Sequence, residues 1–189
     1  MSSAIRPLLF SVGHSNHEID TFISLLNENE IKILVDVRTF PSSRYSPQFN
    51  QQVLKSNLST KGIEYRFFGD SLGGRPSSNE FYDAEGFVLY DRIANSEIFN
   101  RGLSELLEIS KNSKVAMMCS EGSPDHCHRH LLVSRVLLEK GIEVKHILPK
   151  GGLMAAAELL QSQTPPPTLF GEEEMHWKSI QSASHNIQQ

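Results

Sequence analysis

The sequence predicts an α/β fold, with a single open, mostly parallel five-stranded sheet and helices on both faces in a Rossmann-like arrangement. Two observations lead to this prediction. Short runs of β-branched and apolar residues alternate along the chain with segments in which apolar residues recur at helical spacing. Glycine or proline marks the ends of several of these segments. Strands that alternate with helices pair in parallel, because each helix returns the chain to the same end of the sheet.

The first part of the chain contains three of the expected strands and two helices. Asn16 is the expected N-cap of the first helix, and Gly62 is the residue that closes the second. Phe40 and Pro41 end the second strand. The strands are predicted at residues 7–13 (PLLFSVG), 32–38 (KILVDVR) and 63–68 (IEYRFF), and the helices at 19–26 and 50–61.

The second part of the chain continues the alternation after a long loop. Residues 72–86 are rich in Gly, Pro, Ser and Asn, and loops of this length are often functional. Residues 87–110 have the spacing of one helix, or of two helices that are broken near Asn95 and Ser96. A fourth strand is predicted at 114–119 (KVAMMC), an amphipathic helix at 129–140, and a fifth strand at 143–148.

The chain is predicted to form a single α/β domain over residues 1–163, followed by a polar tail over residues 164–189. The tail begins at three consecutive prolines, residues 165–167, and contains an acidic run, residues 172–174. A length of 189 residues suffices for one domain with a full core and is short for two.

Composition and charge exclude several classes of protein. No apolar run approaches the ~20 residues that span a bilayer, so we expect no membrane partner. The N-terminal 15 residues do not match a secretory signal and are interpreted as mature sequence. A net charge of −4 gives little support to non-specific nucleic-acid binding. The two cysteines do not make a disulfide framework, which indicates a cytoplasmic location.

Polar residues collect where four of the predicted strands end. Open α/β sheets bind their ligands beyond the carboxyl ends of the strands, so the sequence predicts a pocket at this edge. The candidate residues are His14 and Ser15 after the first strand, Asp36, Arg38, Arg44 and Tyr45 at the second, Gly73 and Gly74 after the third, and Cys119, Glu121, Cys127, His128 and Arg129 after the fourth.

Several of these side chains have two interpretations. Asp36 lies within an apolar strand, where an unpaired carboxylate is costly to bury. It either pairs with Arg38 or caps the backbone, or it acts as a general acid or base. His14 either bonds a loop carbonyl or transfers protons. Tyr45 either stacks on a flat ligand or packs on the domain surface.

The segment MCSEGSPDHCHRHLL, residues 118–132, contains both cysteines of the chain. The order Cys-x6-His-Cys-His supplies enough metal ligands, but it lacks the Cys-x-x-Cys or His-x3-His pairs that are typical of zinc sites. No metal site is therefore assigned to it. A thiol between a strand and a helix start resembles the position of phosphatase and rhodanese thiolates, although Arg129 lies ten residues after Cys119. Cys127 is the better thiol candidate, and Cys119 is expected to pack as a buried apolar residue.

An anion site is the third interpretation of this segment. Residues 123–125 (SPD) form a turn and capping signal, and Arg129 follows in the first turn of the predicted helix. Free backbone amides together with an arginine bind phosphate or carboxylate groups. Arg38 and Arg44 would contribute further positive charge to this anion site, and Glu121 would be the acid nearest to the bound group.

Five motifs match, in order, a family that is already catalogued. They are SVGHS (11–15), LVDVR (34–38), SRYSPQF (43–49), LGGR (72–75) and CSE followed by HCHR (119–129). Over residues 8 to 148 the chain thereby resembles the domain of unknown function 488 family. The resemblance implies a compact α/β domain in the bacterial or archaeal cytoplasm and supplies no reaction. The last family motif corresponds here to Cys119, Glu121, Cys127, His128 and Arg129.

Three functions remain open on the sequence. The first is a hydrolase or transferase on a phosphorylated or nucleotide-like substrate, with Asp36 and Glu121 as acids and Arg38, Arg44 and Arg129 as anion ligands. The second is a thiol enzyme that uses Cys127 or Cys119, and the third is a non-catalytic module. The expected partner is a small anionic ligand or nucleotide, with nucleic acid as an alternative; the cofactor and the oligomeric state are left unknown.

Overall fold

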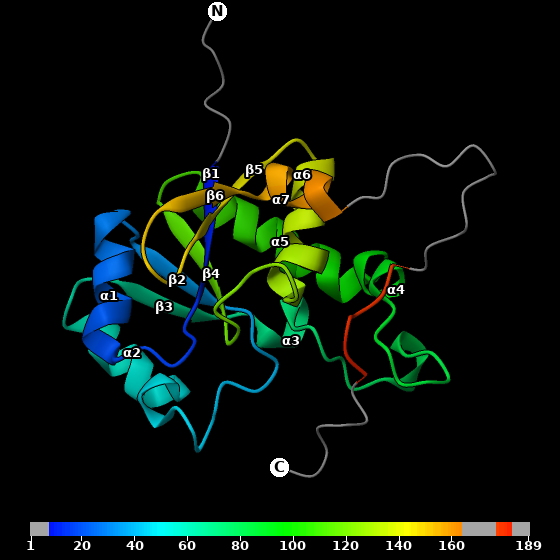
Figure 1. The fold of residues 1–189 in the computed structure, drawn as a ribbon, viewed down its shortest axis with the longest axis horizontal. Helices are drawn as coiled ribbons and strands as arrows, with labels where there is room; N and C mark the ends of the chain where they lie inside the picture. The colour runs from blue at the N-terminus through cyan, green and yellow to red at the C-terminus, as the bar shows by residue number, and fades with distance from the viewer. Residues whose placement is uncertain (1–7, 164–176, 183–189) are drawn as a thin grey trace, which may run out of the picture.

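The computed structural model describes residues 8–163 and 177–182, and Figure 1 shows its sheet between two groups of helices. The strands are β1 (Leu8–Gly13), β2 (Ile33–Asp36), β3 (Glu64–Phe67), β4 (Val115–Cys119), β5 (Glu143–Ile147) and β6 (Leu153–Ala155). They form one sheet of order β3-β2-β4-β1-β5-β6, in which only β6 is antiparallel to its neighbour. The predicted α/β class with an open, mostly parallel sheet is confirmed.

The register of the central strands brings their carboxyl ends to one edge of the sheet. Gly13 at the end of β1 is level with Cys119 at the end of β4, and Asp36 at the end of β2 is level with Met118. The segments that follow these three strands therefore leave the sheet side by side. This edge is where the sequence placed its candidate residues.

Helices cover both faces of the sheet, as predicted. The helical segments are α1 (Ile19–Glu28), η1 (Pro47–Phe49), α2 (Gln51–Ser59), α3 (Gly69–Leu72), η2 (Asn79–Phe81), α4 (Tyr90–Ala94), α5 (Glu97–Ser110), the π-helical η3 (Arg129–Ser134), α6 (Arg135–Glu139) and α7 (Ala156–Gln163). On one face, α1 and α2 pack on the sheet through buried leucine, isoleucine and phenylalanine side chains. On the other face, the core joins the sheet to α3 through α7 and η3.

The alternation of side chains along each strand explains the two cores. Phe10 and Val12 of β1 point to α1 and α2, whereas Leu9 points to the opposite face. Successive residues of a strand face opposite sides of a sheet, and a strand that is covered on both sides is apolar throughout. The central strands β1, β2 and β4, which are buried along nearly their whole length, were recognisable for this reason.

Of the two alternatives for residues 87–110, the structure has the two helices broken near Asn95 and Ser96, because α4 ends at Ala94 and α5 begins at Glu97. The hydroxyl of Ser96 accepts a hydrogen bond from the backbone N–H of Phe99 at 3.2 Å, which caps α5. The expected N-cap of α1 is wrong. Glu18, and not Asn16, occupies that position, and its side chain makes no capping hydrogen bond.

Strand β6 and helix α7 were not predicted from the sequence. The chain turns after β5 through Gly151 and Gly152, both of which have a φ of +84°, and the backbone N–H of Leu148 donates to the Gly152 carbonyl. Glycine adopts this left-handed conformation without steric cost, which allows the tight return. A strand of three residues is too short to show a period of two, so its sequence carried no signal.

Part of the predicted tail is described and packs on the domain. The backbone N–H of Tyr90 donates to the carbonyl of Trp177, whose indole N–H donates to Leu131 O at 2.6 Å. The Arg135 guanidinium lies 4.3 Å from the centre of the Trp177 ring. The triple proline and the acidic run of the tail lie outside the described residues. No helix in the described ranges is long and apolar enough to cross a membrane.

Candidate functional site

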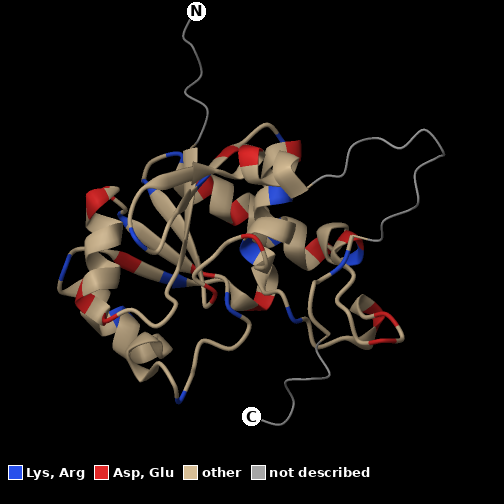
Figure 2. Cartoon of the chain, in the orientation of Figure 1, with Lys and Arg blue, Asp and Glu red and all other residues tan. Residues whose placement is uncertain are grey.

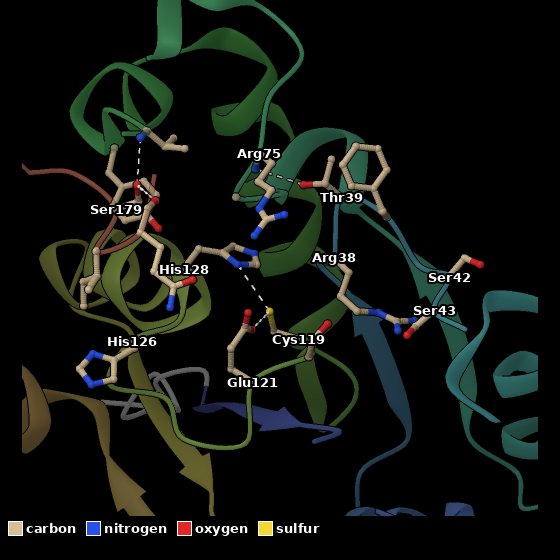
Figure 3. Close-up of a pocket in the computed structure, with 17 residues that line it drawn as sticks. Arg38, Thr39, Ser42, Ser43, Arg75, Cys119, Glu121, His126, His128 and Ser179 are labelled. Carbon is tan, nitrogen blue, oxygen red and sulfur yellow. Dashed lines mark hydrogen bonds between the residues drawn. The ribbon is translucent and has the colours of Figure 1, made fainter. Parts of the chain in front are cut away.

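A cavity of about 520 Å³ opens at the carboxyl ends of β2 and β4. Arg38 and the residues that follow it form one wall, Gly74 and Arg75 a second, and Cys119, Glu121 and His128 the floor (Figure 3). Ser179 and Gln181 of the C-terminal piece complete the lining. Polar groups thus meet at the sheet edge, as the sequence predicted.

Four side chains form a cluster at the floor of the cavity and just beneath it. The carboxyl oxygen Oε2 of Glu121 lies 2.8 Å from the Cys119 sulfur and 3.1 Å from the Cys127 sulfur. The imidazole Nδ1 of His128 lies 3.5 Å from the Cys119 sulfur and 3.9 Å from the Cys127 sulfur. Both cysteines are buried free thiols.

Burial and mutual proximity shift the titration of all four groups. Burial opposes the Cys119 thiolate, but a hydrogen bond from Cys127 and the nearby His128 and Arg129 hold the pKa of Cys119 well below its usual value. Burial and the Cys119 thiolate raise the pKa of Cys127. Desolvation of its carboxyl group, again with Cys119, also raises the pKa of Glu121. Although burial lowers the pKa of His128, the Cys119 thiolate raises it overall.

The loop that carries Glu121 is held by Gly13 and Arg129. A Cβ atom on Gly13 would lie 1.8 Å from the Glu121 carbonyl oxygen, so this position excludes any side chain. Arg129 is completely buried and donates to the carbonyls of Glu121 and, at 2.9 Å, Gly122. The guanidinium of Arg129 therefore orders the loop main chain and does not line the cavity.

Gly74 sets the position of His128. A Cβ atom on Gly74 would lie 2.5 Å from Cγ of His128, so the imidazole occupies the space that a side chain would need. On the other side, His128 Nε2 is 3.0 Å from the Val37 carbonyl oxygen. A carbonyl can only accept, so Nε2 carries the proton and donates it.

Asp36 and Arg38 form a buried ion pair beside the cavity. The Asp36 carboxylate is fully buried and accepts from Arg38 Nη2 at 2.6 Å, from Arg38 Nε at 2.9 Å, and from the Tyr65 hydroxyl at 2.7 Å. Arg38 also donates to Phe49 O. These contacts agree with the interpretation in which Asp36 pairs with Arg38. Asp36 does not line the cavity.

The His14 side chain contacts a loop carbonyl, Arg38 and Phe49. Its Nδ1 donates to the carbonyl of Ser15 at 2.8 Å, its Nε2 lies 3.2 Å from Arg38 Nη1, and its ring stacks on Phe49 with centroids 4.4 Å apart. Burial, together with the charge of Arg38, lowers the pKa of His14 to about 4. These contacts favour the interpretation as a hydrogen bond to a loop carbonyl.

The remaining candidates are divided between cavity and surroundings. Of the residues proposed from sequence, Arg38, Gly74, Cys119, Glu121 and His128 line the cavity. Arg44 and Tyr45 lie on the surface, with the guanidinium 5.3 Å from the Tyr45 ring centre and Tyr45 74% exposed. The residues that do not line it are His14, Ser15, Asp36, Arg44, Tyr45, Gly73, Cys127 and Arg129.

Sequence reasoning missed Arg75 as a candidate. The backbone N–H of Arg75 donates to the Thr39 hydroxyl at 3.1 Å, and its exposed side chain extends into the cavity (Figure 3). No carboxylate in the described part of the chain forms an ion pair with this guanidinium. Arg75 ends the LGGR motif, so the signal was present but was attributed to its glycines.

One protein-family model matches the chain, over residues 18–136, which is more than half of its length. The family is described as Domain of unknown function DUF488. Neither a curated protein nor a solved structure matches the chain.

Proposed function

We propose a function from the geometry of the site, because the chain belongs to the DUF488 family and the description of this family names no reaction. The proposed function is that of an enzyme, a hydrolase or group transferase, which acts on a small anionic substrate of phosphorylated or nucleotide-like character. One observation carries the proposal. The unpaired Arg75 guanidinium and the carboxyl group of Glu121 point into the same cavity (Figure 3).

Arg75 is the proposed substrate-binding residue. A guanidinium presents a planar fork of N–H donors that fits a phosphate or carboxylate group. The neighbouring wall adds the hydroxyl groups of Ser42, Ser43 and Ser120, which line the same cavity. Arg38 also lines the cavity, but the Asp36 carboxylate neutralises its charge. The unpaired positive charge available to a substrate is therefore that of Arg75.

Glu121 is the proposed general acid or base. It is the only carboxylic acid among the described residues that line the cavity. A general acid or base must lie within hydrogen-bond reach of the substrate proton that it transfers, which requires a position on the cavity wall. Asp36 does not have such a position, so we propose that its role is to hold Arg38 in place.

A small substrate is favoured over a nucleic acid. Basic and acidic side chains are interspersed over the described part of the chain (Figure 2), and the net charge is −4. A protein that binds a nucleic acid gains affinity by contacting many phosphates with lysine and arginine side chains. A single unpaired arginine in a cavity suits one anionic group instead. The proposal retains the cytoplasmic location expected from the sequence.

Arg75→Ala tests substrate binding. In a thermal-shift and calorimetric screen of inorganic phosphate, nucleoside phosphates and nucleosides, we expect phosphorylated compounds to bind the wild type. A hydrogen bond to a charged group contributes about 1.5–3 kcal/mol, so Arg75→Ala should weaken binding roughly 10- to 100-fold. The matched control is Arg44→Ala, which removes an exposed arginine outside the cavity. Equal affinity in both variants would refute the assignment of Arg75.

Glu121→Gln tests catalysis. The amide keeps the shape of the side chain and cannot transfer the proton, so turnover should fall on the order of 100-fold or more while the affinity stays within about threefold. The measurement is product formation from the best ligand of the screen, followed by liquid chromatography. A ligand that binds but is never altered by the wild type would instead identify a non-catalytic binding module.

A thiol enzyme is the second candidate, because Cys119 lines the cavity 3.5 Å from the His128 imidazole. Cys127 does not line the cavity, so in this candidate Cys119 and not Cys127 is the nucleophile. Alkylation of Cys119 would then abolish turnover, and unchanged turnover of Cys119→Ser would exclude the candidate.

A further inference from the structure

At the floor of the cavity and just beneath it lies a set of metal-ligand atoms that the proposed acid–base function does not use. The sulfurs of Cys119 and Cys127 and one ring nitrogen of His128 all lie within 4.8 Å of one another. We propose that these three side chains bind a single zinc ion, with a fourth coordination position open to the cavity. This inference does not depend on the identity of the substrate.

The distances between the donor atoms agree with tetrahedral coordination. Zinc lies about 2.3 Å from thiolate sulfur and about 2.0 Å from imidazole nitrogen, so a sulfur and a nitrogen on the same ion are about 3.5 Å apart. The two sulfur–nitrogen distances in the cluster are 3.5 Å and 3.9 Å. An ion therefore fits between the three donors with only small adjustments of the side chains.

The orientation of His128 is that of a metal ligand. Because Nε2 donates its proton to the Val37 carbonyl, Nδ1 is available as a lone-pair donor, and it faces both sulfurs. Histidine ligands generally donate their second ring N–H to a carbonyl or a carboxylate, which fixes the tautomer and the ring plane. The absence of a side chain at Gly74 lets the ring occupy this position.

The ligand types select the metal. Two thiolates and an imidazole suit zinc and other borderline-soft ions, whereas magnesium and calcium require oxygen ligands. Both sulfurs lie within hydrogen-bond distance of Glu121 Oε2. On binding, the ion takes the place of any proton that the two sulfurs still hold, which passes to solvent, and the pair of thiolates neutralises its charge.

The open position faces the cavity. Cys119 and His128 line the cavity, whereas Cys127 is 1% exposed and approaches the ion from the protein interior. Zinc with three protein ligands and one open position is the arrangement of catalytic rather than structural sites. Glu121 lies next to that position, 2.8 Å and 3.1 Å from the two sulfurs. A water bound there would be within reach of its carboxylate.

The first experiment measures metal binding without any substrate. The full chain is purified with a reductant, stripped with a chelator, and titrated with Zn²⁺ against a chromophoric competitor. We expect one ion per chain by mass spectrometry. Titration with Co²⁺ should give the strong visible absorption that is typical of tetrahedral cobalt. It should also give a near-ultraviolet band from thiolate-to-cobalt charge transfer.

Two ligand variants and one control locate the ion. Loss of a residue that only supports a ligand weakens metal binding about 10- to 100-fold, so His128→Gln and Cys127→Ser should weaken it by at least that factor. The control is His126→Gln, which changes an exposed histidine two residues away and should leave the zinc affinity as in the wild type. Circular dichroism confirms that each variant is folded, and either ligand variant suffices if the other fails to fold.

Three results would overturn the inference. One is the absence of bound ion after the reduced protein is titrated with Zn²⁺. Another is retention of wild-type zinc affinity by folded His128→Gln or Cys127→Ser. The third is a Cys119–Cys127 disulfide in protein that was purified under reductant. Arg75→Ala, which tests substrate binding, should keep its zinc, so failure of the proposed function and failure of the metal site are distinguishable.

Discussion

At the scale of single residues, burial and pairing separate the charges that hold the structure from those that can act on a substrate. Asp36 and Arg38 are 0% and 4% exposed, and the Arg38 side chain donates two hydrogen bonds to the Asp36 carboxylate. Their charges therefore neutralise each other inside the protein. Arg75 and Glu121 carry the same two charges, but both line the cavity. The residue type alone does not distinguish these two pairs.

Asp36→Asn should therefore damage stability. The variant leaves the Arg38 guanidinium buried without a carboxylate, and removal of one partner of a buried ion pair costs about 3–5 kcal/mol of unfolding free energy. Urea denaturation measures the loss. The control is Glu64→Gln, which breaks the exposed pair with Arg66 and should cost at most about 1 kcal/mol. If the two variants are equally stable, the Asp36–Arg38 pair does not have the structural role given to it.

At the scale of elements, the connection from β4 to α6 contains three of the four clustered side chains at the cavity floor. It carries Glu121, Cys127 and His128 and then enters η3 directly, where Arg129 and His130 are both completely buried. π-helical turns occur often at functional sites. A buried polar chain joins η3 to the sheet, because His130 Nδ1 lies 3.0 Å from His146 Nε2 and the Ser11 hydroxyl lies 2.6 Å from His146 Nδ1.

This contact between η3, β1 and β5 predicts a loss of stability in acid. Burial, with the charges of His130 and Arg129 beside it, lowers the pKa of His146 to about 3, from 6.5. Between these two values the unfolded chain binds a proton that the folded chain does not. The unfolding free energy is therefore highest above pH 6.5 and should fall by about 1.4 kcal/mol per pH unit below it on account of this histidine. His14 acts in the same direction down to a pH of about 4.

Urea denaturation at a series of pH values measures this slope. In His146→Gln the group that titrates is absent, so the stability of the variant should depend less steeply on pH than that of the wild type. Identical slopes for the two proteins would show that His146 is not held neutral in the fold.

At the scale of the whole molecule, the C-terminal piece, residues 177–182, brings a distant part of the sequence to the cavity. Trp177 packs between Tyr90 and Arg135, and the next residues bridge to the segment before α4, where Leu89 pairs with Lys178. Ser179 and Gln181 then line the cavity. The cavity is therefore built from five separated segments, and it is complete only when this piece is docked.

We expect the C-terminal piece to unfold together with the domain. Trp177 is the only tryptophan of the chain, so its fluorescence reports the docking of this piece, while far-ultraviolet circular dichroism reports the helices and the sheet. In a two-state transition different probes give coincident curves. Fluorescence that changes at lower urea concentration than the dichroism would show that the piece detaches first.

The sequence by itself determined the α/β class, all five parallel strands and the edge at which the cavity lies, and it offered the break between α4 and α5 as one of two alternatives. These features depend on local periodicity. A short apolar run between turn residues can be recognised as a buried strand from the sequence alone. The five motifs likewise sufficed to recognise the family. The three-residue β6 was missed because it is too short to have a pattern, and the N-cap of α1 because a capping residue type occurs by chance.

Only the tertiary structure decided which side chains meet in the cavity. Arg129 is near Glu121 in sequence but is buried under its loop, whereas Arg75 is distant in sequence and reaches the cavity wall. The spacing of Cys119, Cys127 and His128 argued against a metal site, yet their donor atoms converge in the fold. The physical reason is that the direction of a side chain at a strand end depends on strand register, close backbone contacts such as Gly13 with the Glu121 loop, and long-range hydrogen bonds. None of these has a local signature in the sequence.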